Sequence, residues 1–142
     1  MQISLVHSFV KDLELKNPLI TNDVLKENVT EDKEKKETFT IGFSVAYPEN
    51  KDDEFEVIFT TTVNLASGWI LNVEYVSIFK TSDPTDDTFK DSPFPVVNAP
   101  AIAFPFLRSF VATLLLNAGH PAVIFPAINF TTFEKEQETK IQ

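Results

Sequence analysis

Large apolar residues alternate with small or polar ones along much of this chain. From Phe39 to Tyr47 every second residue is large and apolar, and the alternation repeats from Phe55 to Leu65. Successive side chains of a strand point to opposite faces of its sheet, so this spacing predicts two strands that share one apolar face. Residues 48–53, PENKDD, are turn formers and predict that the two strands form a hairpin.

Two further stretches have the same period of two. A third follows the tight connection at 66–68, with Trp69, Leu71, Val73, Tyr75 and Phe79 on one face. At the N-terminus the even offsets of Ile3, Leu5, Phe9, Leu13 and Leu15 predict a long strand, interrupted in pattern by His7 and Lys11. Four long strands, three of them consecutive, indicate an antiparallel sheet whose apolar face must be covered.

Two connections have a different composition. Residues 17–37 contain Pro18 and the charged run at 31–37, which predicts a solvated connection. Residues 80–95 are rich in Asp, Ser, Thr and Pro, which predicts a crossover loop without regular structure. This loop carries Phe89 and Phe94, whose rings either pin it to the core or serve a function.

The most apolar segment predicts a helix. Asn98, Ala99 and Pro100 suit a helix start, and we expect Pro105 at the first position of the regular helix because an interior proline costs about 3 kcal/mol. The helix should end near Asn117, with Gly119 as the residue after the cap and Pro121 beyond it. Residues 105–117 would span about 20 Å. A short second helix is expected at 130–140.

This predicted long helix is apolar around most of its circumference. A helix that covers one face of a sheet needs an apolar stripe only about 100° wide. We therefore expect a second face of this helix to be buried against another subunit. The residues expected at that oligomer interface are Phe106, Leu107, Phe110, Val111 and Leu114.

Composition narrows the class of protein. The 142 residues fit one domain, 1–142, of the α+β class, and 14 Phe against one Trp and two Tyr supply rings that suit a core or an apolar partner surface. The formal charge of −9 opposes binding to nucleic acid and to anionic membranes. The N-terminus lacks a secretory signal pattern, and residues 99–116 contain two prolines and an arginine, so we expect a cytoplasmic protein without membrane insertion.

Residues suited to catalysis or metal binding are scarce. There is no cysteine, and His7 and His120 lie far apart without a metal-binding motif, so no metal or other cofactor is expected. No nucleophile elbow, phosphate-binding loop or dinucleotide fingerprint occurs. Acidic pairs such as Asp86 and Asp87 lie in turn-like segments and are more simply solubilising. We expect a protein that is not an enzyme.

One segment carries a specific resemblance. Residues 97–130 read VNAPAIAFPFLRSFVATLLLNAGHPAVIFPAINF, and this stretch resembles the SecB family of protein-export chaperones. The shared features are the helix start at Pro100, the Phe104-Pro105-Phe106 step before Leu107-Arg108, and, after the helix, Gly119 with Pro121 and then Pro126 with Asn129-Phe130. Residues 9–18 and 55–79 resemble the family's first strand and central hairpin more weakly.

The resemblance implies a four-stranded antiparallel sheet with one long and one short C-terminal helix, assembled as a homotetramer that is a dimer of dimers. It also implies ATP-independent holding of unfolded preproteins in long apolar grooves, and delivery to the SecA motor. By position, the client-binding groove is expected to include Phe39, Ile41, Phe43, Phe89, Phe94, Val96, Phe125 and Phe133.

The chain also departs from the family pattern. Acidic residues on the outer sheet face contact the motor in this family, and here Asp12 matches such a position, with Glu14 beside it as a second candidate, whereas Lys16 and Asn72 stand where the family has acidic residues. A chaperone dedicated to one client, as in toxin-antitoxin modules, is an alternative. So are a carrier of a small apolar ligand and a small enzyme.

Overall fold

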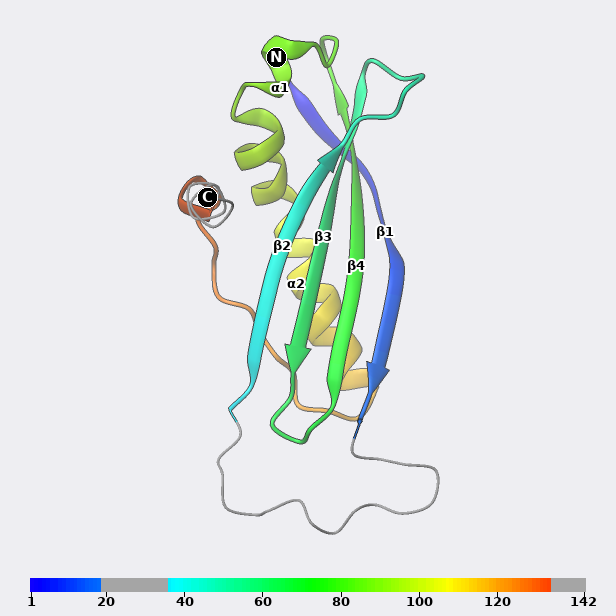
Figure 1. The fold of residues 1–142 in the computed structure, drawn as a ribbon, viewed down its shortest axis with the longest axis vertical. Coiled ribbons are helices and arrows are strands. Elements are labelled where there is room, and N and C mark those ends of the chain that lie inside the picture. The colour runs from blue at the N-terminus through cyan, green and yellow to red at the C-terminus, as the bar shows by residue number, and fades with distance from the viewer. Residues whose placement is uncertain (19–35, 134–142) are drawn as a thin grey trace. The chain divides into compact units, whose positions relative to one another are not determined.

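The four predicted strands form one sheet. The computed structural model describes residues 1–18 and 36–133, and in Figure 1 the strands follow the order β1-β4-β3-β2. The α+β class and the four-stranded antiparallel sheet with C-terminal helices are therefore confirmed. The observed strands are β1 (Ile3–Lys16), β2 (Thr38–Ala46), β3 (Glu54–Asn64) and β4 (Ile70–Thr81).

The two predicted strand connections are observed as tight turns. In the first, the Lys51 amide donates to the Pro48 carbonyl at 3.4 Å. In the second, the Leu65 amide donates to the Trp69 carbonyl at 2.8 Å, and Gly68 has φ of 96°. Residues that have a Cβ atom rarely adopt a positive φ of this size. The glycine at position 68 therefore allows the short connection between β3 and β4.

The chain divides into two compact units. The first unit comprises Met1–Ser8, Val45–Val57 and the described residues from Ser77 onward, and it contains every helix found in residues 1–18 and 36–133. The second unit comprises the described residues of 9–44 together with Ile58–Val76, and it consists of strand segments and their turn. The prediction of one domain over residues 1–142 stays a prediction.

The second unit has one buried set of side chains. On β3 these are Phe59, Thr61 and Val63, and their neighbours Thr60 and Thr62 are more exposed, as the alternation predicts. Thr61 is 3% exposed, and its hydroxyl donates to the Thr40 carbonyl of β2 at 2.7 Å, which satisfies this buried polar group. On β1, however, Phe9 and Leu13 are 39% and 37% exposed, so the apolar face of this edge strand is only partly covered.

The first unit is built around stacked phenylalanine rings. Phe55 lies with its ring centroid 5.2 Å from Phe79 on one side and 5.2 Å from Phe89 on another. Phe89 belongs to α1 (Asp87–Lys90), a single helical turn within the predicted crossover loop. The prediction of a loop without regular structure from Lys80 to Pro95 was therefore wrong. The Asp86 carboxylate caps α1 by accepting the Phe89 amide hydrogen at 2.9 Å, and burial of the Phe89 ring holds the turn in place.

The long helix begins where Asn98, Ala99 and Pro100 predict its start, with Asn98 as the N-cap residue. A π-helical turn, η1 (Phe94–Asn98), leads directly into α2 (Ala99–Asn117), and Pro105 lies inside this helix. The expectation that the regular helix begins only at Pro105 was wrong. An interior proline removes the hydrogen bond to the carbonyl four residues earlier, which belongs to Ala101. Because Ala101 is exposed, water can donate to that carbonyl, which lowers the cost of Pro105.

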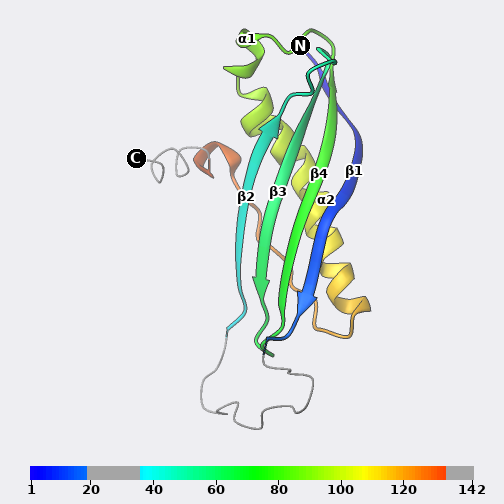
Figure 2. The same cartoon turned by 45° about the vertical axis from the view of Figure 1, so that its right-hand side comes forward.

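The end of α2 agrees with the prediction. The His120 amide donates to the Leu115 carbonyl at 2.8 Å and the Gly119 amide donates to the Leu116 carbonyl at 3.1 Å, which is the Schellman pattern. Gly119 has φ of 93°, as expected for the residue after the cap. Figure 2 shows the chain turning back after α2. Residues 130–133 are helical, which places the start of the second helix as predicted, and the rest of that helix lies outside the described residues.

By length and composition alone, residues 94–117 could cross a membrane, with a mean hydropathy of 1.7 in the most apolar window. Core helices of soluble proteins pass the same test. Here one stripe of α2 is buried within the protein, so its apolar character has a structural use: Ala99, Pro100, Ala103, Phe104, Leu107, Val111 and Leu115.

Candidate functional site

The described residues do not form a metal centre. No group of three or more His, Cys, Asp or Glu side chains in residues 1–18 and 36–133 is arranged to hold a metal ion. The only resolved pKa shift among these residues is that of Tyr47, whose pKa burial raises above its ordinary value of 10.0. Both units carry exposed apolar side chains, in different forms.

In the first unit, Phe94 is half-buried at the edge of the aromatic core. Its ring stacks on Phe89 with centroids 6.1 Å apart and planes 6° apart. A hollow of about 320 Å³ opens beside these two rings, with Met1 and Pro84 among its walls and Asp83 and Asp86 among its polar groups. This hollow is large enough for one apolar side chain and has an acidic rim.

A second apolar spot of the first unit lies at the start of the second helix. Phe133 is half-buried and packs edge-on against Phe130, with ring centroids 5.6 Å apart. Phe130 in turn contacts Phe104 of α2 with centroids 5.7 Å apart. A hollow of about 340 Å³ lies here between Ile128, Asn129, Thr132 and Phe133. The buried ring of Phe130 therefore positions the more exposed ring of Phe133.

In the second unit, apolar side chains follow the edge strand β2. Phe39 is 37% exposed, whereas Ile41 and Phe43 are half-buried. The Phe43 ring lies 6.1 Å from that of the fully buried Phe59 on β3. Because β2 has a neighbouring strand on one side only, its backbone and these side chains border solvent.

The structure separates the predicted groove residues into two classes. Phe39, Ile41, Phe43, Phe94, Val96 and Phe133 keep exposed surface. Phe89 and Phe125 are only 2% and 1% exposed, so their assignment to an open groove was wrong. Both rings lack a polar group and fill the core of the first unit, where Phe89 packs against Phe55 and Phe125 packs against Phe104. Met1 lines the hollow beside Phe94 and Ile128 lines the hollow beside Phe133. Both were missed because isolated residues carry no periodic signal.

The exposed side of α2 carries a second apolar stripe. Ile102, Phe106 and Leu116 are 41%, 53% and 59% exposed, and Phe110 and Leu114 are half-buried. Leu107 and Val111 are fully buried within the single chain, so their assignment to an oligomer interface was wrong. The helical period places them on the inner face, one residue away from Phe106 and Phe110. Ile102 and Leu116 belong to the exposed stripe and were missed.

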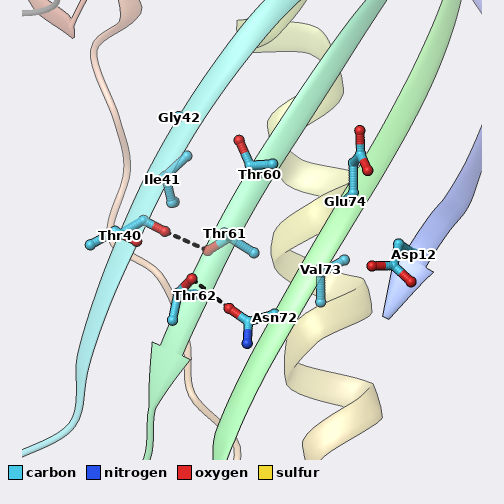
Figure 3. Close-up of a pocket in the computed structure, with 10 residues that line it drawn as sticks. All are labelled: Asp12, Thr40, Ile41, Gly42, Thr60, Thr61, Thr62, Asn72, Val73 and Glu74. Carbon is cyan, nitrogen blue, oxygen red and sulfur yellow. Dashed lines mark hydrogen bonds between the residues drawn. The ribbon is translucent and has the colours of Figure 1, made fainter. Parts of the chain in front are cut away.

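The outer face of the second unit is polar. A hollow of about 350 Å³ lies on this face. Figure 3 labels the residues that line it, which include Asp12, Thr60, Thr62, Asn72 and Glu74. The Thr62 hydroxyl donates to the Asn72 side-chain oxygen at 2.7 Å, so the amide at this family position is used within the sheet. Lys11 lies 3.7 Å from Glu74 and offsets its charge.

The two predicted motor-contact residues differ in their surroundings. Glu14 lies 3.1 Å from the ammonium group of Lys16, and both side chains are more than half exposed. Among the described residues, Asp12 has no ion-pair partner within 4.0 Å. Asp12 lies at the rim of the hollow in Figure 3.

Comparison with known proteins agrees with this arrangement. The family model described as preprotein translocase subunit SecB matches residues 1–140. A protein-export protein SecB from Sphingopyxis alaskensis is 26% identical over 132 residues, which cover 90% of this chain and 72% of that protein. The corresponding protein of Novosphingobium aromaticivorans is also 26% identical, over 99% of this chain and 78% of its own length.

A solved structure shares the fold. It is a SecB-like chaperone from Mycobacterium tuberculosis in complex with a peptide from an antitoxin, with a TM-score of 0.62 and 10% sequence identity. The similarity covers 89% of this chain and 87% of that one. SecB family proteins are soluble chaperones rather than enzymes. With the family model matched across nearly its whole length, on the sheet and helices described above, this chain belongs to the SecB family of protein-export chaperones.

Proposed function

We propose that this chaperone holds non-native preproteins without nucleotide, on apolar side chains that its own fold leaves exposed. The observation that carries the proposal is the exposure of large apolar side chains outside the α2 stripe, among them Phe39 of β2, which is 37% exposed. Such exposure is costly in a protein with no partner for it, and it marks interaction surface.

The binding energy follows from burial. Each Phe or Leu of a client that is buried on such a surface gains roughly 1.5 to 3 kcal/mol, offset by ordering of the client chain. A folded client has already buried those side chains. Selectivity for the unfolded state therefore requires no recognition of a sequence motif.

The proposed client surface uses six of the predicted residues. Phe94, Val96 and Phe133 supply it in the first unit, and Phe39, Ile41 and Phe43 supply it along β2 in the second. The hollows at Phe94 and at Phe133 suit single apolar side chains of a client, because each is bordered by a ring that the core holds in place.

The test is suppression of aggregation of a reduced, unfolded protein in the absence of nucleotide. Phe39→Ser is expected to reduce protection, because loss of one Phe contact weakens binding by about 10- to 100-fold. Phe9→Ser is the matched control, since Phe9 is also on an edge strand and is 39% exposed against 37% for Phe39. Equal protection by folded Phe39→Ser and wild type would rule out the β2 surface.

Assembly and location belong to the same proposal. The exposed apolar stripe of α2 supports burial of Ile102, Phe106 and Leu116 against other copies, in a homotetramer built as a dimer of dimers. Family membership supports a cytoplasmic location and a contact with the SecA motor through Asp12, and more weakly through the paired Glu14.

A dedicated client is the second candidate. The Mycobacterium tuberculosis relative in fold was solved with an antitoxin peptide, which favours this variant of the function. A dedicated chaperone would protect one partner far better than a set of unrelated unfolded proteins in the same aggregation assay. A small-ligand carrier would leave aggregation unchanged.

A further inference from the structure

The turn α1 is too short to be stable by itself. An isolated helix of four residues lies far below the length at which helices persist in water, so contacts with the rest of the first unit must hold it. Three anchors are present on or beside it.

The first anchor is the Phe89 ring, buried between Phe55 and Phe94. The second is the Lys90 ammonium group, which lies 4.6 Å from the centroid of the Tyr47 ring at the end of β2. Adjacent residues of α1 thus contact different elements. Phe89 packs in the core, whereas Lys90 contacts Tyr47, which lies between β2 and the β2–β3 turn.

The third anchor lies just before the turn. The Thr85 amide donates to the Asp52 carbonyl at 2.6 Å, and the Thr85 hydroxyl reaches the same oxygen at 3.1 Å. The Asp86 cap then starts the helix. The crossover segment is therefore tied to the β2–β3 turn immediately before α1.

Open space borders α1 on two sides. A polar hollow of about 570 Å³ lies against Tyr47, Thr85 and Lys90, and the apolar hollow of about 320 Å³ lies against Phe89 and Phe94. A turn that is bordered by open space and held by a few contacts can detach without disturbing the strands. Its release would uncover Phe89 and the side of Phe55 that Phe89 covers.

We propose that α1 is a lid, closed by Lys90 on Tyr47, whose opening adds Phe89 and Phe55 to the apolar surface offered to a client. The proposal rests on the proposed holding function. The closed form hides these two rings and the open form presents them. Client binding and lid opening therefore favour each other.

The test compares two lysines that border the same hollow. Lys90→Met keeps most of the apolar stem and removes the ammonium group from Tyr47, and it should raise affinity for reduced, carboxymethylated α-lactalbumin by about 2- to 5-fold. Lys51→Met makes the same charge change, but Lys51 pairs with Glu54 at 3.4 Å rather than with Tyr47, so affinity should stay at the wild-type value. Backbone hydrogen exchange at residues 87–90 should accelerate in Lys90→Met alone.

A disulfide that holds the lid closed should change the affinity for the client in the opposite direction. The chain has no cysteine, so Asp52→Cys with Thr85→Cys introduces one pair, at positions whose backbones are already hydrogen-bonded. The disulfide should lower affinity at least 2-fold, and reduction should restore it. Unchanged or weaker binding by Lys90→Met than by Lys51→Met, with both folded, would overturn the lid. Absence of binding by every variant, with faster exchange in Lys90→Met, would overturn the holding function instead.

Discussion

Phe125 stacks on Phe104 of α2 with ring centroids 6.2 Å apart and planes 19° apart. This contact ties the segment after α2, which turns back in Figure 2, to the helix that it has just left. Phe125 is 1% exposed, whereas its neighbour Ile124 is 73% exposed. Adjacent apolar residues therefore have opposite environments.

This difference predicts effects of very different size on the free energy of unfolding. Phe125→Ala should lower the free energy of unfolding by about 3 to 5 kcal/mol, because it leaves a cavity beside Phe104. Ile124→Ala should change it by less than about 1 kcal/mol, since the side chain is already in water. Urea denaturation of both variants measures the two values, and a Phe125→Ala change below that of Ile124→Ala would contradict the packing.

Substitutions at a second pair of neighbours, Phe106 and Leu107, should distinguish effects on assembly from effects on folding. Phe106 is 53% exposed on the outer stripe of α2, and Leu107 is fully buried. Phe106→Asp should shift the protein to a smaller species on a sizing column without loss of the folded protomer, because a charge would be desolvated at the interface. Leu107→Ala should instead cost about 2 to 5 kcal/mol of folding stability. An unchanged elution volume for Phe106→Asp would remove the α2 stripe from the interface.

Asp12 should matter more than Glu14 for the motor contact. Glu14 is paired with Lys16, whereas Asp12, at the rim of the outer hollow, has no ion-pair partner among the described residues. Binding to SecA, measured calorimetrically at low salt, should weaken more for Asp12→Asn than for Glu14→Gln, and the difference should shrink as salt screens the charge. Identical affinities for wild type and Asp12→Asn would place the contact elsewhere.

The burial of Tyr47 predicts that the free energy of unfolding falls at alkaline pH. Burial raises its pKa above 10.0 in the folded protein, so the unfolded chain ionises first as pH rises. The contribution of neutral Tyr47 is fully present below pH 10.0 and is lost as pH rises through the folded-state pKa. Tyr47→Phe should therefore show a smaller fall in unfolding free energy than wild type above pH 10. Parallel curves for the two proteins would contradict this effect of burial.

The strands could be predicted because their signal is local. Period-two alternation marked all four, and turn residues such as Gly68 and Asp53 marked where the chain reverses. The signal for the end of α2 at Gly119 was equally local, since the positive φ required there favours glycine. Pro105 was misread because its cost depends on whether water reaches the carbonyl of Ala101, which is a tertiary matter.

The sequence by itself determined the α+β class, the order of strands along the chain, and, through residues 97–130, the resemblance to the family. It also determined that the chain has more apolar residues on its long helix than one face can use. Only the tertiary structure decided which phenylalanine is core and which is surface: Phe89 and Phe125 are covered, and Phe39 and Phe106 are open. The physical reason is that chemically identical rings differ only in which neighbours pack against them, and those neighbours come from distant parts of the chain.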